Sequence, residues 1–292
     1  MKIYAFGVSQ PGKGAQVGFE EAVDYVHSLP YEDRYYSGMR LEAVKQQKNG
    51  TYKIDFTKLR NKGLPGKATK KGPTKSLGLA NNEVVSEETA ALFIPQNNVL
   101  LLQLNMYGPH RGLIENYMSV FAYQAAKQLK GTNGKNEGFD IGAKLNPSVQ
   151  AQFNKFKLMR KLEFKVSVPA VSAANRQQGQ SLGKVIDNGL IGGPRNAHVV
   201  LSAGRKKAAS LDLGYVTDAI KYLRSGPGDV ETLRVSGKEY IDSNTVVLDL
   251  VDAVLKTDKP VKPGDDRRLP QKDRWSALID AYDEWMSDGV LP

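Results

Sequence analysis

The stretch Val99-Leu-Leu-Leu-Gln-Leu-Asn105 indicates more about the fold of this 292-residue chain than any other. Its three successive leucines are typical of a short strand buried on both faces, because a half-buried strand would alternate apolar and polar residues. A second apolar run, Ala90 to Pro95, lies three polar residues upstream. We therefore expect an apolar hairpin whose second strand has no solvent-facing side.

Segments around this hairpin add helices and further strands. Apolar residues recur at helical spacing in 113–130 and in 19–30, whereas residues 1–8 resemble a short strand. An Asn-Gly pair separates two extended runs, 39–47 and 52–59, and such a pair favours a tight hairpin because both residues tolerate positive φ. The first half is thus predicted to be rich in strands.

The second half alternates strands with helices, and the glycine-rich stretch 131–138 is the best candidate for a linker. These patterns predict an α+β protein of mixed sheets with packed helices, in two domains. We expect a β-rich N-terminal domain over 1–130, an α+β domain over 139–256, and a linker with a C-terminal helix over 257–292. The elements expected beyond the glycine-rich linker are strands at 139–145, 160–168, 197–203, 230–237 and 245–251, and helices that begin at 147, 170 and 211.

The predicted C-terminal helix carries an aromatic stripe too large to leave in water. Trp275, Leu278, Ile279 and Tyr282 share one face, and Trp285 continues it one turn later. Exposed apolar surface of this size marks a contact, and aromatic anchors are typical of interface cores. The stripe is therefore expected to pack either on its own domain or on a second subunit.

Composition excludes several classes of function. The absence of cysteine excludes disulfides, thiol catalysis and cysteine-based zinc sites, and the three histidines are scattered along the chain. No apolar stretch reaches the roughly 18 residues that a membrane helix needs, and the first residues lack the apolar core of a secretory signal. We expect a cytoplasmic protein with no metal, no cofactor and no small-molecule substrate.

Charge points to a polyanionic partner. The chain has 41 basic and 31 acidic side chains, a formal net charge of +10. Residues 265–292 are acidic on balance, so the rest of the chain is more basic than this total suggests. Lysine and arginine that neutralise phosphates release condensed counterions, which favours nucleic-acid binding. The alternative is that net charge only keeps the protein soluble.

The basic side chains gather in three clusters. Residues 58–75 contain no acidic residue and several glycines and prolines, which predicts a mobile basic loop. In the absence of a base-reading helix motif, we expect contacts mainly to DNA phosphates, without sequence preference, from clusters that line one groove. The candidate DNA-binding residues are Lys58, Arg60, Lys62, Lys67, Lys70, Lys71 and Lys75 in the first cluster, Lys155, Lys157, Arg160 and Lys161 in the second, and Arg205, Lys206 and Lys207 in the third.

A metal-dependent nuclease is the enzymatic alternative. Glu163 and Lys165 lie two residues apart in an extended run, so they share one face of the strand. With Asp140 upstream they could form a PD-(D/E)xK-like site that holds Mg²⁺ through carboxylate oxygens. Ordinary strand alternation explains the Glu163–Lys165 pair equally well, so a non-catalytic protein is the favoured interpretation. A protein-interaction module is the third possibility.

Two motifs resemble a known family. Residues 99–105, followed by Met106-Tyr-Gly-Pro109 and a helix, resemble the strand, turn and helix of the phage lambda RexA family. Phe164-Lys-Val-Ser-Val-Pro169 resembles the proline-ended strand that opens the second half of that family, and the likeness extends over most of 90–290.

The resemblance carries implications that the residues alone do not. It implies a homodimer that binds DNA without strong sequence preference, and a fold related to the recombination-associated protein RdgC. It also implies a prophage setting, in superinfection exclusion or control of the lysogenic switch, with a small phage membrane protein as a possible partner.

Overall fold

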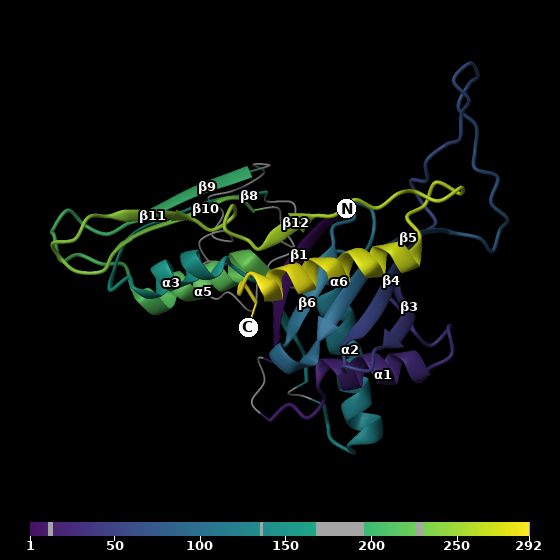
Figure 1. Cartoon of the computed structure of the whole chain (residues 1–292), viewed down its shortest axis with the longest axis horizontal. Helices are drawn as coiled ribbons and strands as arrows, with labels where there is room; N and C mark the ends of the chain where they lie inside the picture. Colours follow the sequence, from purple (N-terminus) through teal and green to yellow (C-terminus); the bar gives the residue numbers. More distant parts are fainter. Residues whose placement is uncertain (11–13, 135–136, 168–195, 226–229, 292) are drawn as a thin grey trace.

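The computed structural model describes residues 1–10, 14–134, 137–167, 196–225 and 230–291. This part of the chain forms two antiparallel sheets, one of eight strands and one of four, with helices packed against both (Figure 1). The predicted α+β class is confirmed. A relationship to RdgC stays a prediction.

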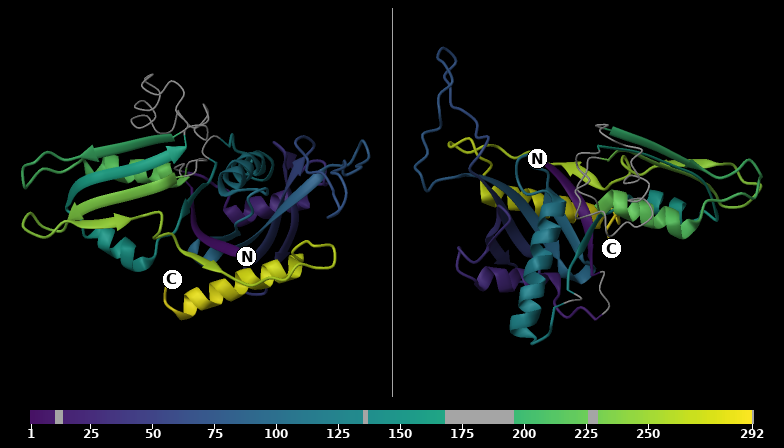
Figure 2. Two further views of the ribbon diagram at one scale, coloured as in Figure 1. Left: turned by 90° about the horizontal axis from the view of Figure 1, so that it is seen from above. Right: turned by 180° about the vertical axis from the view of Figure 1, so that it is seen from behind.

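The large sheet has the strand order β12-β1-β6-β5-β4-β3-β2, and β7 pairs with β1 on the same side as β12. Two helices, α1 and α2, cover one face and a third, α6, crosses the other (Figures 1 and 2). The bounds are β1 (Lys2–Ser9), α1 (Phe19–Ser28), β2 (Tyr35–Tyr36), β3 (Met39–Gln46), β4 (Tyr52–Arg60), β5 (Val85–Ile94), β6 (Val99–Gln103), α2 (Arg111–Leu129), β7 (Asp140–Ala143), β12 (Lys256–Asp258) and α6 (Gln271–Ser287).

The small sheet has the order β11-β10-β8-β9. Two helices, α3 and α5, pack on one of its faces (Figure 1). The bounds are α3 (Pro147–Asn154), β8 (Leu158–Ser167), β9 (Asn196–Ser202), α5 (Leu213–Ser225), β10 (Val230–Lys238) and β11 (Val246–Asp249). The helix expected to begin at 170 lies outside the described residues.

The leucine run is the middle of the large sheet, as its pattern predicts. All five residues of β6 are buried, and the short 3₁₀ turn Pro95–Asn97 joins it to β5 in the expected hairpin. Leu100 and Leu102 belong to the core under α1 and α2, whereas Leu101 belongs to the core under α6. Each successive side chain enters a different core because strand side chains alternate between faces.

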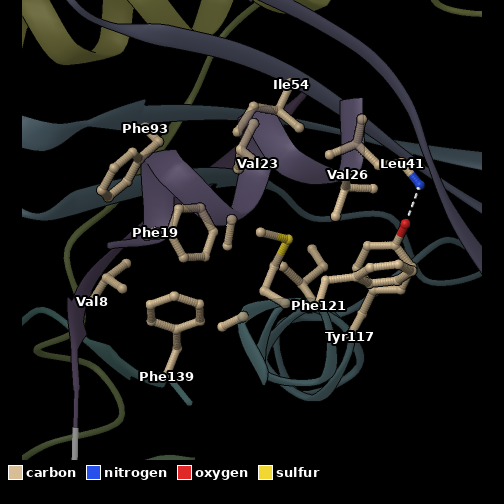
Figure 3. Packing of buried hydrophobic residues seen from close by; sticks show 14 of the residues in the cluster. Val8, Phe19, Val23, Val26, Leu41, Ile54, Phe93, Tyr117, Phe121 and Phe139 are labelled. Atoms are coloured by element: carbon tan, nitrogen blue, oxygen red, sulfur yellow. Dashed lines mark hydrogen bonds between the residues drawn. The ribbon is translucent and has the colours of Figure 1, made fainter. Parts of the chain in front are cut away.

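The core under α1 and α2 combines aliphatic side chains with several packed aromatic rings (Figure 3). Phe19 from α1 packs against Phe93 at 4.7 Å between ring centroids, and against Phe139 at 5.1 Å. The Tyr117 ring of α2 is buried, and its hydroxyl accepts a hydrogen bond from the Leu41 amide and donates one to the Arg34 carbonyl. The buried hydroxyl is therefore satisfied, which is the condition for burying tyrosine at low cost.

The aromatic stripe of α6 is covered by its own chain. Trp275, Leu278 and Trp285 are buried against the face of the large sheet opposite α1 and α2. The indole N–H of Trp275 donates to the Ile54 carbonyl at 3.2 Å. Of the two expected locations for the stripe, the structure has the intramolecular one. The homodimer stays a prediction.

A buried ion pair fixes α6 on the sheet. The guanidinium of Arg274 lies 2.9 Å from the Asp55 carboxylate and 2.7 Å from that of Glu88, and its side chain is only 3% exposed. Gln271 donates a further hydrogen bond to Asp55 at 2.6 Å. Burial raises the pKa of Asp55 to about 7, although Arg274 acts in the opposite direction. Two carboxylates from two strands, Asp55 on β4 and Glu88 on β5, thus select one position for the helix.

The strand expected at 139–145 is observed as β7 and belongs to the large sheet. β7 pairs with β1 over Phe6–Ser9, and β12 pairs with the first part of the same strand. At the junction the Ala5 amide donates to the Leu255 carbonyl, and the Ala5 carbonyl accepts from the Lys144 amide. The small sheet therefore lies on a segment that leaves the large sheet at Lys144 and returns at Leu255, and the glycine-rich linker does not separate the two sheets. The division into folding domains stays a prediction.

Replacing Arg274 should destabilise the protein far more than replacing a neighbouring surface arginine. Arg274→Ala leaves the Asp55 carboxylate buried without its partner, and such a loss costs about 3–5 kcal/mol. Arg268→Ala removes an ion pair to Glu88 from a side chain that is 56% exposed, and should cost no more than about 1 kcal/mol. Urea unfolding of both variants measures the difference, and equal small losses would contradict the anchoring role of Arg274.

Candidate nucleic-acid interface

The two faces of the small sheet differ in character. One face, which carries Phe164 and Leu233, is buried against α3 and α5. The opposite face carries charged side chains that pair with each other. Lys161 and His198 both contact Glu163, at 2.6 and 3.0 Å, and Arg234 pairs with Asp249 at 2.9 Å. Since these charges are mutually compensated, the face as a whole is not strongly basic.

Three loops gather at one end of the small sheet, at the left of Figure 1. They are residues 155–157, 203–212 and 239–245. The Lys157 amide donates to the Lys238 carbonyl at 2.9 Å, and the Lys207 ammonium lies 3.8 Å from Asp242, so all three loops are neighbours. We call this end the basic tip and define it by the cations Lys155, Lys157, Arg205, Lys206, Lys207 and Lys238.

The cations of the basic tip are mostly uncompensated. The first five of them are exposed. In the described part of the chain, only the exposed pair of Lys207 with Asp242 joins one of these cations to a carboxylate. An exposed pair of this kind contributes little binding energy. The tip therefore carries a local excess of positive charge.

Arg160 joins the second predicted cluster to the third. Its guanidinium donates to the carbonyls of Gly204, Lys206, Lys207 and Ala209, at 3.1, 3.0 and 3.5 Å for the first three. These hydrogen bonds hold the loop that carries Arg205, Lys206 and Lys207 against the start of β8. The Nη1 and Nη2 groups of Arg160 thus position this loop, and its predicted contact with phosphate stays a prediction.

The basic loop lies apart from the tip. Lys58 and Arg60 end strand β4, and residues 61–84 project from the opposite end of the molecule (Figures 1 and 2). Within this excursion, Lys67 and Lys75 exchange backbone hydrogen bonds of 2.8 Å. The interpretation that all three clusters line one groove is therefore wrong. The second and third clusters meet, whereas Lys58 to Lys75 form a separate basic surface.

The residues of the predicted nuclease site lie in different places. Glu163 and Lys165 are on β8 of the small sheet, but Asp140 is on β7 of the large sheet. Hydrogen bonds from Lys161 and then His198 lower the pKa of Glu163, so its carboxylate is already engaged. Across the described ranges, no three carboxylate or histidine side chains come close enough to hold a metal ion.

Asp140 instead lies beside a structural charge cluster at the start of α2. Glu115 accepts a hydrogen bond from the Ile141 amide at 2.8 Å, and Arg111 donates to the Ile141 carbonyl at 2.7 Å. Burial raises the pKa of Glu115 to about 7, and the Ile141 hydrogen bond and the charge of Arg111 oppose this only in part. Both side chains thus help to hold β7 against α2.

A cavity of about 690 Å³ opens between the two sheets. Its wall is largely apolar, with Leu104, Met106 and Leu250 among its members, and Arg111 lies at its rim beside the start of α2. The Arg111 guanidinium is used by the Ile141 carbonyl and by Glu115. Polar side chains, among them Gln103, Asn105 and His110, also line the cavity.

The fold and the basic tip define an α+β protein with a cationic end built on a small antiparallel sheet. The chain belongs to the family of unknown function DUF6731, which matches residues 13–284. No curated protein matches the chain significantly. None of the helices in the described ranges has the length and apolar character that a bilayer crossing requires.

Loss of the Arg160 hydrogen bonds should expose the loop after β9 to trypsin. In Arg160→Ala, the carbonyls of residues 204–209 lose their donors, so cleavage after Arg205, Lys206 or Lys207 should become several times faster. Lys161→Ala, on the same strand, removes one cation without touching that loop and serves as the control. Mass spectrometry of early fragments reads out the sites. Equal cleavage rates in both variants would show that Arg160 does not hold the loop.

The buried Glu115 carboxyl should make stability depend on pH. Its folded-state pKa lies above its ordinary value of 4.5, so ionisation disfavours the folded state as the pH rises from about 4.5 to 7. Relative to the wild type, Glu115→Gln should gain stability over that range, by up to about 1.4 kcal/mol per pH unit. Urea unfolding at pH 5, 6, 7 and 8 measures the difference.

Glu21 supplies a control of opposite sign. A hydrogen bond from Lys130 lowers the pKa of Glu21, so its ionised form favours the folded state. The stability that ionised Glu21 contributes is fully present above its ordinary pKa of 4.5 and is lost as the pH falls below it. The stability deficit of Glu21→Gln relative to the wild type should therefore stay constant from pH 5 to 8. The same trend in both variants would contradict the assignment for Glu115.

Proposed function

We propose that this protein binds nucleic acid through the basic tip, by contacts to phosphates and without strong sequence preference. The observation that carries the proposal is the set of Arg160 hydrogen bonds that brings Arg205, Lys206 and Lys207 beside Lys155 and Lys157. An arginine whose Nη1 and Nη2 groups donate to backbone carbonyls of this loop holds the loop and its cations in place. Pre-positioned cations lose less conformational entropy when they bind.

The shape of the tip supports phosphate contacts rather than base reading. The tip consists of loops and a hairpin turn, and the neighbouring helices α3 and α5 lie against the sheet. Sequence reading in duplex DNA requires side chains that reach base edges, usually from a helix placed in the major groove. A loop surface of lysines and arginines supplies the electrostatic term, which is independent of sequence.

Two alternative functions have less support. The separation of Asp140 from Glu163 counts against a nuclease of the PD-(D/E)xK type. A role of the charge in solubility alone does not account for an arginine dedicated to holding three cations together. The prophage setting, the homodimer and the membrane-protein partner rest on the sequence resemblance, and the proposal does not depend on them.

Two triple variants with the same loss of charge test the proposal. Arg205→Ala/Lys206→Ala/Lys207→Ala alters the basic tip, and Lys67→Ala/Lys70→Ala/Lys71→Ala alters the loop at the other end of the molecule. Fluorescence anisotropy with labelled oligonucleotides of about 12 nucleotides, single-stranded and duplex, measures affinity at several salt concentrations. The tip variant should bind both probes more weakly, and its log–log salt slope on duplex DNA should fall by up to about 2.7, at about 0.9 per phosphate contact.

The loop variant separates a defined site from a general effect of charge. On a short probe it should bind like the wild type, because the loop lies far from the tip. Equal weakening in both variants would mean that net charge alone governs binding. Full affinity in the tip variant, or no binding by the wild type at low salt, would overturn the proposal.

A further inference from the structure

We infer that the basic tip prefers single-stranded nucleic acid to duplex, and that Tyr240 is the platform on which an unpaired base stacks. This inference rests on the proposed function and specifies the ligand of the same site. Its evidence is separate from the cation cluster, because it comes from the turn between β10 and β11.

Tyr240 is presented to solvent by a turn that contains several internal hydrogen bonds. Its side chain is 67% exposed, and the neighbouring Ile241 is 46% exposed. The Tyr240 amide donates to the Ser243 hydroxyl at 3.1 Å, and the Tyr240 carbonyl accepts from the hydroxyl and the amide of Ser243. Lys238 donates to the Ile241 carbonyl at 3.1 Å. The turn is thus fixed by its own hydrogen bonds, and the exposed ring makes no contribution to the core.

The ring lies in the same tip as the phosphate-binding candidates. Asp242 on this turn faces Lys207, and the Lys238 carbonyl accepts from the amide of Lys157. A cationic surface with an adjacent aromatic face is the usual design of sites for single strands, since every base has a π-face. Both components are present here on backbone segments joined by hydrogen bonds.

The acidic residues of the turn favour a single strand over a duplex. Glu239 and Asp242 flank Tyr240 and Ile241 in the sequence, and Asp242 lies 3.8 Å from the Lys207 ammonium. A duplex presents phosphates from two strands and keeps its bases stacked inside, so it would bring charge against these carboxylates and leave the ring unused. A single strand can place its phosphates on the cations and its bases on Tyr240.

Anisotropy titrations of the full chain with a fluorescent oligo-dT of about 12 nucleotides and a hairpin duplex of similar length test this preference. The wild type should bind the oligo-dT at least about fivefold more tightly than the duplex. Tyr240→Ala should weaken oligo-dT binding about fivefold or more, the usual loss for one base–aromatic stack, and leave duplex binding unchanged. Tyr240→Phe, which keeps the ring, should bind like the wild type.

Tyr107 provides the matched control. It is 60% exposed and lies beside Arg60 of the other basic surface, so Tyr107→Ala should not alter binding of the short probe. Equal affinity for oligo-dT and duplex, or full oligo-dT affinity in Tyr240→Ala, would overturn the inference. If the Arg205/Lys206/Lys207 variant still weakened both probes in that case, the proposed function would stand. If neither probe bound the wild type, both would fall.

Discussion

The need to cover strand β6 on both faces determines how this chain is arranged. Leu100 and Leu102 enter one core and Leu101 enters the other, so a layer of helix is required on each side of the sheet. Helix α2 is the next helix after β6 in the sequence and, together with α1 from near the start of the chain, supplies the first layer. The second layer comes from α6, near the end of the chain. Because α6 must return to this sheet, the whole small sheet lies on an excursion between β7 and β12, which both pair with β1.

The buried charges under α6 add specificity to an apolar contact. An aromatic stripe alone could slide along a sheet of alanine, leucine and isoleucine, because the hydrophobic effect has no direction. Arg274 reaches Asp55 on β4 and Glu88 on β5, and only one placement of the helix satisfies both carboxylates. Taking these ions out of water is expensive, so their contribution to net stability is modest while the penalty for a wrong register is large.

Local elements could be predicted from the sequence, but their partners could not. The leucine run of β6 and the helical spacing of α2 each indicate from the sequence which residues are buried. The Asn-Gly pair likewise indicates the hairpin of β3 and β4. The sequence of a four-residue strand such as β7 does not indicate which strand it pairs with, so its pairing with β1 could not be predicted. The hydrogen-bond partners of Arg160 could not be predicted either, because the carbonyls that it binds lie 44 to 49 residues away in the sequence. An arginine can bind a phosphate as readily as a backbone carbonyl. Tyr240 lies in a turn, so no helical or strand periodicity in the sequence indicated it as a candidate binding residue.

The separation of the two basic surfaces affects how they could act on a long nucleic acid. The tip and the 61–84 excursion lie at opposite ends of the long axis, so a short oligonucleotide engages one of them (Figure 1). A longer strand held at the tip would be present near the excursion at an effective concentration set by the length of the intervening nucleic acid. Phosphate contacts at the second surface would then strengthen binding without any direct contact between the two protein surfaces. The basic side chains of this chain, whose net charge is +10, would in this way form two distant binding sites for one polymer. Affinity would then rise with polymer length beyond the size of a single site.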